Sequence, residues 1–259
     1  MKKVINSKNL ILKNFIEKSY KFQRQIKTMK VSLSFEKTES NDVSIMVDAF
    51  RASTSITIAL NKFKKVIPAF SPEIARKIAI DTGGILAGEK DGVTIEDFDL
   101  GNSPVAIENY QTDEDTLILS TSNGTRILEN MNSTVLIGCF LNAESVAKQA
   151  IKIATSQIDL VMAGWKGKFA IEDFLSCGEI ISHIMKSQEE NKNCKVSEYA
   201  QSAMLASRND QLLRKTILNT RAAKRLAKLG FKDDVEFSLR KNVSQNVAIY
   251  KDGELTLSN

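Results

Sequence analysis

Residues 43–62, VSIMVDAFRASTSITIALNK, contain the pattern that decides the fold. The apolar run 43–47 ends at Asp48, and after a short turn a helix-like segment occupies 51–62. A strand whose residues are nearly all apolar is typical of a sheet that is covered on both faces. A strand, a turn and a helix in this order indicate the building unit of an α/β protein.

The same unit recurs three more times along the chain. The runs TLILS (116–120), TVLIGC (134–139) and DLVMAG (159–164) each lead into a polar loop and then a helix-like stretch. Near the C-terminus, Asp252 and Gly253 separate the strand-like runs NVAIY and ELTL, which is a hairpin signal. We therefore predict an α/β fold with three layers, α/β/α, a largely parallel or mixed sheet and a C-terminal β-hairpin.

Two further elements are predicted in the C-terminal third. Residues 208–229 favour one basic amphipathic helix, with Gly230 as its C-cap. The run VEFSLRK, residues 235–241, alternates apolar and polar residues and so favours a strand.

Composition limits the class of protein. Of the 259 residues, 42% are hydrophobic and 26% are charged, as in soluble globular proteins, and no uncharged apolar run approaches the roughly 18 residues of a membrane span. Three cysteines without a C-x-x-C spacing indicate reduced thiols and a cytoplasmic protein. A single histidine excludes a His-rich zinc site, and neither G-x-x-x-x-G-K-[ST] nor G-x-G-x-x-G occurs.

The net charge of +5 arises from the N-terminal residues. Residues 1–28 carry a net charge of +7, which leaves −2 for the rest of the chain. A body without a basic stripe does not indicate a nucleic-acid partner. We predict a loosely ordered basic extension over 1–28 and one α/β domain over 29–259. An amphipathic helix in the extension that binds an acidic surface is the alternative. The oligomeric state stays open, a homo-oligomer included.

Polar and charged residues follow the predicted strands. In open α/β sheets, ligands bind at the carboxyl ends of the strands, so these residues are candidates for a site. They are Asp48, Arg51, Asn123, Thr125, Arg126, Asn142, Lys166, Lys168, Glu172 and Asp173.

The acidic loop IEDFDLGNSP, residues 95–104, places Glu96, Asp97 and Asp99 close together. Such carboxylates repel one another unless a cation offsets their charge. We therefore expect this loop to cap the same sheet edge and to meet a divalent cation, Arg51 or Arg126. Oxygen ligands of this kind favour Mg²⁺.

Structural roles are the alternatives for these residues. Asp48 is well placed to cap the following helix, and SNGT at 122–125 has the composition of an ordinary turn. Glu172 and Asp173, in the first turn of a helix, complement the helix dipole.

Five motifs, taken in order, resemble those of the 2-phosphosulfolactate phosphatase family. They are IMVDAFRASTSI (45–56), GEKDGVTIEDFDLGNSP (88–104), STSNGTRIL (120–128), GCFLNAESVA (138–147) and GKFAIEDFLSCGEII (167–181). The resemblance runs from about Met29 to the C-terminus. It implies a Mg²⁺-dependent phosphatase that hydrolyses 2-phosphosulfolactate, a small multi-anionic phosphate ester, to sulfolactate and inorganic phosphate in coenzyme M biosynthesis. The alternatives are a Mg²⁺-dependent phosphatase of another small acidic organic phosphate and a non-catalytic anion-binding homologue.

The resemblance also implies roles for the candidate residues. The metal ligands would be Asp48, Asp99 and Asp173. The groups that hold substrate oxygens would be Arg51, Arg126, Asn102, Asn123 and Thr125. Glu89 or Glu172 would orient the attacking water. Asp97 departs from the family pattern, which usually has Gly there, and Ala49 and Phe50 replace aliphatic residues.

Overall fold

The structure is a computed structural model that describes residues 28–121, 127–128, 131–188 and 194–258. Residues 1–27 of the predicted extension lie outside these ranges, as do the site candidates Asn123, Thr125 and Arg126. None of the described helices combines the length and the apolar character needed to cross a membrane.

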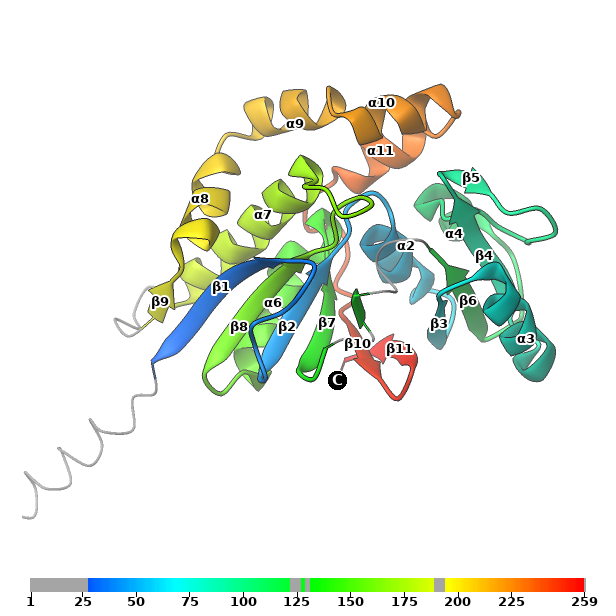
Figure 1. Ribbon diagram of the computed structural model, residues 1–259, viewed down its shortest axis with the longest axis horizontal. Helices are drawn as coiled ribbons and strands as arrows, with labels where there is room; N and C mark the ends of the chain where they lie inside the picture. Colours follow the sequence, from blue (N-terminus) through cyan, green and yellow to red (C-terminus); the bar gives the residue numbers. More distant parts are fainter. Residues whose placement is uncertain (1–27, 122–126, 129–130, 189–193, 259) are drawn as a thin grey trace, which may run out of the picture.

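A mixed sheet of 11 strands runs through the described part of the chain (Figure 1). In spatial order the strands are β5 (Val93–Thr94), β4 (Ile85–Lys90), β6 (Thr116–Ser120), β3 (Lys65–Ala69), β11 (Glu254–Leu257), β10 (Ala248–Lys251), β7 (Thr134–Gly138), β2 (Val43–Val47), β8 (Gln157–Met162), β1 (Met29–Phe35) and β9 (Cys194–Val196). The neighbours from β7 to β9 pair in parallel, and so do β4, β6 and β3. The predicted α/β class and the mixed sheet are thus confirmed.

The C-terminal hairpin joins the two parallel blocks. Strand β10 pairs antiparallel with β7, and β11 pairs antiparallel with β3. Between them, Asp252 and Gly253 have φ values of 52° and 85°, the left-handed conformation that a two-residue hairpin turn requires. The predicted hairpin is confirmed, and it also closes the gap in the middle of the sheet.

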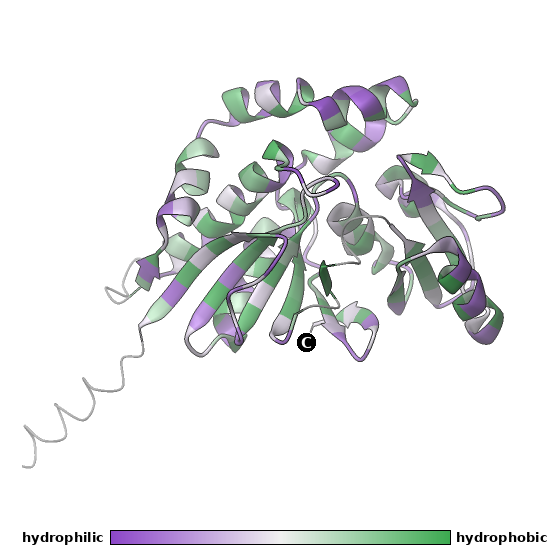
Figure 2. Cartoon of the chain, viewed as in Figure 1, coloured by the Kyte–Doolittle hydropathy of each residue, from purple (hydrophilic) through white to green (hydrophobic). Residues whose placement is uncertain are grey.

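Helices cover both faces of the sheet, as predicted for three layers. On one face, α6 (Ala143–Ile153), α7 (Ile171–Ser187) and α8 (Glu198–Ala206) pack on the β7–β9 block. On the same face of the other block lies α3 (Pro72–Thr82), and on the opposite face lie α2 (Ala52–Ala59) and α4 (Pro104–Asn109). The alternating side chains of β2 fit this arrangement. Ile45 and Val47 belong to the hydrophobic core under α6, α7 and α8, and Met46 belongs to the core on the opposite face, under α2. Figure 2 shows hydrophobic residues concentrated along the strands.

The predicted single helix over 208–229 is wrong. The chain forms α9 (Asp210–Leu218) and α10 (Arg221–Lys228), and Thr220 between them starts the second helix by accepting a hydrogen bond from the Ala223 N–H at 3.0 Å. Gly230, with a φ of 90°, follows the end of α10, which agrees with the predicted C-terminal signal.

The predicted strand over 235–241 is also wrong. Residues Lys232–Ser238 form α11. Val235 packs against Ala223 and Leu226 of α10, whereas Phe237 belongs to the core under α2. Residues two apart share one side of a strand but point in different directions from a helix, so the helix lets both side chains reach their partners. In Figure 1 the segment α9–α11 runs from α8 toward the end of the molecule that contains β5.

Candidate active site

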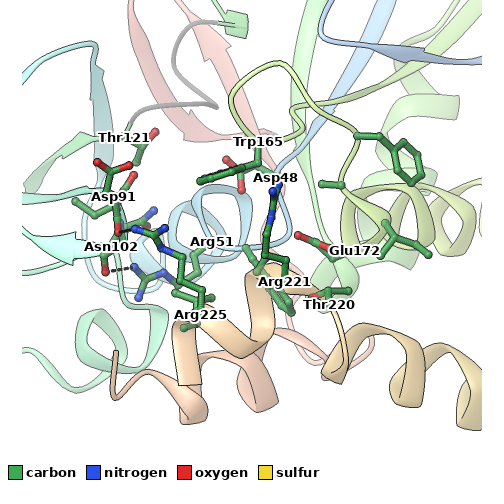
Figure 3. A pocket seen from close by; sticks show the side chains of 18 residues that line it. Asp48, Arg51, Asp91, Asn102, Thr121, Trp165, Glu172, Thr220, Arg221 and Arg225 are labelled. Carbon is green, nitrogen blue, oxygen red and sulfur yellow. Dashed lines mark hydrogen bonds between the residues drawn. The ribbon is translucent and has the colours of Figure 1, made fainter. Parts of the chain in front are cut away.

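A cavity of about 370 Å³ lies where the carboxyl ends of β2, β8, β4 and β6 meet (Figure 3). The turns after these strands contribute most of its lining, and α10 closes it from the opposite side. Its charged lining residues are Asp48, Arg51, Glu89, Asp91, Glu172, Arg221 and Arg225. The position agrees with the expectation for an open α/β sheet.

Beside Asp91, three carboxylates reach the cavity from three separate parts of the fold. Asp48 follows β2 and is 6% exposed, Glu89 lies at the end of β4, and Glu172 is in the first turn of α7. Burial raises the pKa of Asp48 to about 7, and repulsion by Glu89 and Glu172 adds to the rise. Burial also raises the pKa of Glu172, and Arg221 offsets part of this rise. A cation placed among these groups would therefore be stabilised.

The side chain of Asp48 does not cap α2, because Arg51 is the residue at the start of this helix and no side-chain hydrogen bond caps it. The backbone oxygen of Asp48 accepts the N–H of Ser53 at 2.9 Å. Its own backbone N–H donates to Ser53 Oγ at 2.9 Å. These bonds fix the turn after β2, so that Asp48 lines the cavity on a rigid support.

Asp173 has a positioning role in the structure, and its role as a metal ligand stays a prediction. It is 2% exposed, and its two oxygens accept the backbone N–H groups of Ala49 at 2.8 Å and Gly164 at 2.9 Å. Burial raises the pKa of Asp173 well above its usual range, with repulsion by Asp48 and Glu172. The side chain ties the turn after β2 to the turn after β8 and does not line the cavity.

The acidic loop does not place its carboxylates in the cavity, contrary to the prediction. Phe98 and Leu100 are buried, so the alternating side chains of Asp97 and Asp99 point outward. Asp97 forms two hydrogen bonds with Arg76, at 2.8 and 2.9 Å. Asp99 is exposed, accepts the Leu86 N–H at 2.9 Å and does not line the cavity that contains Asp48, and its role as a metal ligand stays a prediction.

The end of this loop does reach the site. Asn102 is 3% exposed and lines the cavity. Its Oδ1 has no hydrogen-bond partner among the described residues. A buried amide oxygen of this kind needs a donor or a cation.

Arg51 lines the cavity, but its charge is already matched. Its Nη1 lies 2.6 Å from Asp234 Oδ2 in an ion pair whose side chains are 3% and 2% exposed. Asp234 Oδ1 accepts a hydrogen bond from Ser103 Oγ at 2.6 Å, and the Arg51 guanidinium lies 4.6 Å from the centre of the Phe231 ring. Sequence reasoning missed Asp234, which lies directly before the segment 235–241 that was predicted as a strand.

Arg221 and Arg225 of α10 form a basic wall, which faces the carboxylates of the cavity. The guanidinium carbons lie 4.4 and 5.9 Å from the centre of the Trp165 ring, which follows β8. Lys166 and Lys168 are the basic candidates that the sequence predicts after the same strand. Lys166 instead pairs with Asp91 at 2.5 Å, and Lys168 does not line the cavity.

Asn142 also lies away from the cavity. It is fully buried, and its side chain bonds the Cys139 N–H at 2.9 Å and the backbone oxygens of Ile137 and Asn246 at 3.1 and 2.8 Å. It therefore fixes the start of α6. Among the residues that the structure describes, no three His, Cys, Asp or Glu side chains are gathered as a preformed metal site.

Comparison with known proteins places the chain in a family. Residues 29–253 match the family described as 2-phosphosulpholactate phosphatase. The chain is 42% identical over 229 residues to the 2-phosphosulfolactate phosphatase of Methanothermobacter thermautotrophicus, covering 88% of this chain and 96% of that protein. It is 33% identical over 226 residues to the protein of that name from Methanocaldococcus jannaschii, covering 84% and 92%. A Clostridium acetobutylicum protein named "Probable 2-phosphosulfolactate phosphatase" is 32% identical over 225 residues, with 85% and 94% covered. The chain therefore belongs to the 2-phosphosulfolactate phosphatase family.

Proposed function

We propose that this protein is a Mg²⁺-dependent phosphatase that hydrolyses 2-phosphosulfolactate to sulfolactate and inorganic phosphate. The observation that carries the proposal is a cavity in which buried carboxylates, led by Asp48, face a wall of arginines. The names of the relatives supply the substrate. The three cysteines are free thiols, in keeping with work in the reducing cytoplasm.

The residues around Asp48 fit a magnesium ion. Mg²⁺ is usually held by one or two carboxylates, by water and by the phosphate of the substrate, so a preformed cage of three acidic residues is not required. Asp48 and Glu172 would supply the carboxylates, and the Oδ1 atom of Asn102 would supply a neutral oxygen. When bound, the ion would neutralise negative charge on the phosphoryl oxygens.

The chain's own residues would orient the reactants. In the reaction, the oxygen of water attacks phosphorus, and the bond between phosphorus and the C2 oxygen of the substrate breaks. A proton from the water ends on the sulfolactate hydroxyl, and the phosphate leaves.

We assign the orientation of the water to Glu172 in preference to Glu89. Both side chains line the cavity, but Glu89 Oε2 already accepts the Gly92 N–H at 2.5 Å. Arg51, whose positive charge lowers the pKa of Asp48 against the effect of burial, would donate to a phosphoryl oxygen. Backbone N–H groups at the start of α7 would stabilise the same anion.

The test is phosphate release from 2-phosphosulfolactate by the full chain, before and after chelation with EDTA. We expect activity to disappear on chelation and to return when Mg²⁺ is added back alone. Full activity without metal, or recovery with Zn²⁺ only, would contradict the proposed ion. A protein that binds sulfolactate but releases no phosphate in Mg²⁺ would instead be a non-catalytic homologue.

A further inference from the structure

We infer that Arg221 and Arg225 of α10 form a binding site for the acidic groups that the substrate carries beside its phosphate. The ligand class is a short organic acid with sulfonate and carboxylate groups. This inference rests on the proposed function for the position of the phosphoryl group, which would lie at Asp48 and Glu172.

The charges of the cavity separate into two ends. Arg51 is neutralised by Asp234 at 2.6 Å, and Asp91 is paired with Lys166 at 2.5 Å. Neither Arg221 nor Arg225 forms an ion pair with an Asp or Glu of the described residues. The two guanidinium groups on α10 thus supply positive charge that is available to an anionic ligand.

Trp165 holds this pair in place. Residues 165–168 form a tight turn, in which Lys166 and Gly167 have φ values of 50° and 73°, and the Trp165 N–H donates to the Lys168 oxygen at 2.9 Å. The turn presents the indole ring to both guanidinium groups, at 4.4 and 5.9 Å from its centre. A guanidinium that stacks on a ring keeps the N–H groups along its edge available to oxygen atoms.

The spacing of the two arginines suits a ligand with two acidic groups. Residues four apart lie on the same face of a helix, so Arg221 and Arg225 project to the same side of α10, as Figure 3 shows. Arg221 is near enough to Glu172 to lower the pKa of that carboxyl against the effect of burial. Arg221 therefore adjoins the acidic end of the cavity, which contains Asp48 and Glu172. Arg225 Nη2 donates to the Asp91 backbone oxygen at 2.6 Å, which directs this side chain toward the turn between β4 and β5.

The substrate of the proposed reaction has the matching charges. 2-Phosphosulfolactate carries three anionic groups on a three-carbon frame, and one metal ion at the phosphoryl group leaves the sulfonate and the carboxylate uncompensated. A planar guanidinium matches the oxygens of both groups. We therefore assign one acidic group to each arginine of the basic wall.

The kinetic test uses Arg221→Gln and Arg225→Gln, with Lys224→Gln as the matched control. Lys224 lies on α10, is exposed and does not line the cavity, so its substitution removes the same charge from the same helix. With 2-phosphosulfolactate, we expect each arginine substitution to lower kcat/KM by about 10- to 150-fold, the range for losing a hydrogen bond to a charged group. With glycerol 2-phosphate, which has no second acidic group, we expect changes below about 3-fold. Equal losses with both substrates, or losses as large in the control, would overturn the inference.

A binding test separates this inference from the proposed function. Calorimetry measures the affinity of the folded full chain for sulfolactate in the presence of Mg²⁺. We expect the two arginine variants to bind it at least about 10-fold more weakly than the Lys224→Gln variant. If this loss occurs in a protein that hydrolyses neither ester, the binding site stands and the proposed reaction fails. Unchanged sulfolactate affinity in both arginine variants would overturn the binding site, whatever the activity.

Discussion

Replacing Asp48 by Asn should abolish activity and, in the absence of metal, make the protein more stable. The carboxylate is 6% exposed, and burial with repulsion by Glu89 and Glu172 raises its pKa from 3.8 to about 7. The unfolded chain has the ordinary pKa, so ionisation above pH 3.8 favours unfolding. An amide of nearly the same shape removes this penalty.

The magnitude follows from the pKa shift. A rise of about three pKa units corresponds to roughly 4 kcal/mol at pH values above 7. The buried amide N–H₂ group of the variant lacks a full set of acceptors, which costs about 1–3 kcal/mol. We therefore expect a net gain of about 1–3 kcal/mol at pH 8, or roughly 2–10 °C in Tm for a chain of this size.

The gain in stability depends on pH, because the raised pKa of Asp48 makes its ionisation favour unfolding. Below pH 3.8 the carboxyl group is protonated in both states, so the ionisation penalty is absent. It grows as the pH rises toward 7 and is constant above that value. The stability of Asp48→Asn relative to the unchanged protein should therefore be smaller at pH 5 than at pH 8.

The measurements are urea unfolding in EDTA at both pH values, and phosphate release in Mg²⁺. Loss of the carboxylate should lower kcat by on the order of 10²–10³ or more. Asp99→Asn is the matched control, because this exposed carboxylate lies outside the cavity and its loss should change stability by less than about 0.5 kcal/mol. A variant that is less stable at pH 8 in EDTA, or one with nearly normal kcat, would refute the reasoning.

Two further predictions concern the support of the site and the N-terminal residues. Asp234→Asn leaves Arg51 without its buried counter-charge and should destabilise the fold by about 3–5 kcal/mol in urea unfolding. The control Ser103→Ala removes only one hydrogen bond to Asp234 and should cost about 1 kcal/mol. Similar losses in the two variants would contradict a dominant role for the ion pair. Deletion of residues 1–28 should leave kcat and Tm nearly unchanged, because β1 and the family match both begin at residue 29, and a loss of several degrees would show that the extension contacts the folded domain.

The sequence was sufficient to predict those elements whose conformation depends on local contacts. Apolar runs that end at polar turns predicted the strands, and Asp252 with Gly253 predicted the hairpin, because backbone conformation in these segments depends on neighbours along the chain. Asp48 could be placed at the cavity for the same reason. It follows a buried strand, and the carboxyl ends of parallel strands share one edge of the sheet.

The direction of side chains in the acidic loop depended on packing. Three carboxylates within four residues predicted a cation site, but Phe98 and Leu100 are drawn into the core and turn Asp97 and Asp99 outward. Burial of the two apolar side chains outweighs the grouping of charges, since Asp97 and Asp99 each find a partner at the surface.

The partners of the site residues were decided only by tertiary structure. Arg51 meets Asp234, which lies 183 residues away in the chain, and α10 brings Arg221 and Arg225 to Trp165 across the cavity. The local pattern of 235–241 favoured a strand, but packing against α10 and the central core made this segment part of a helix. Such contacts arise from the burial of surfaces distant in sequence, so residue spacing along the chain could indicate the acidic end of the cavity but not the basic wall opposite it.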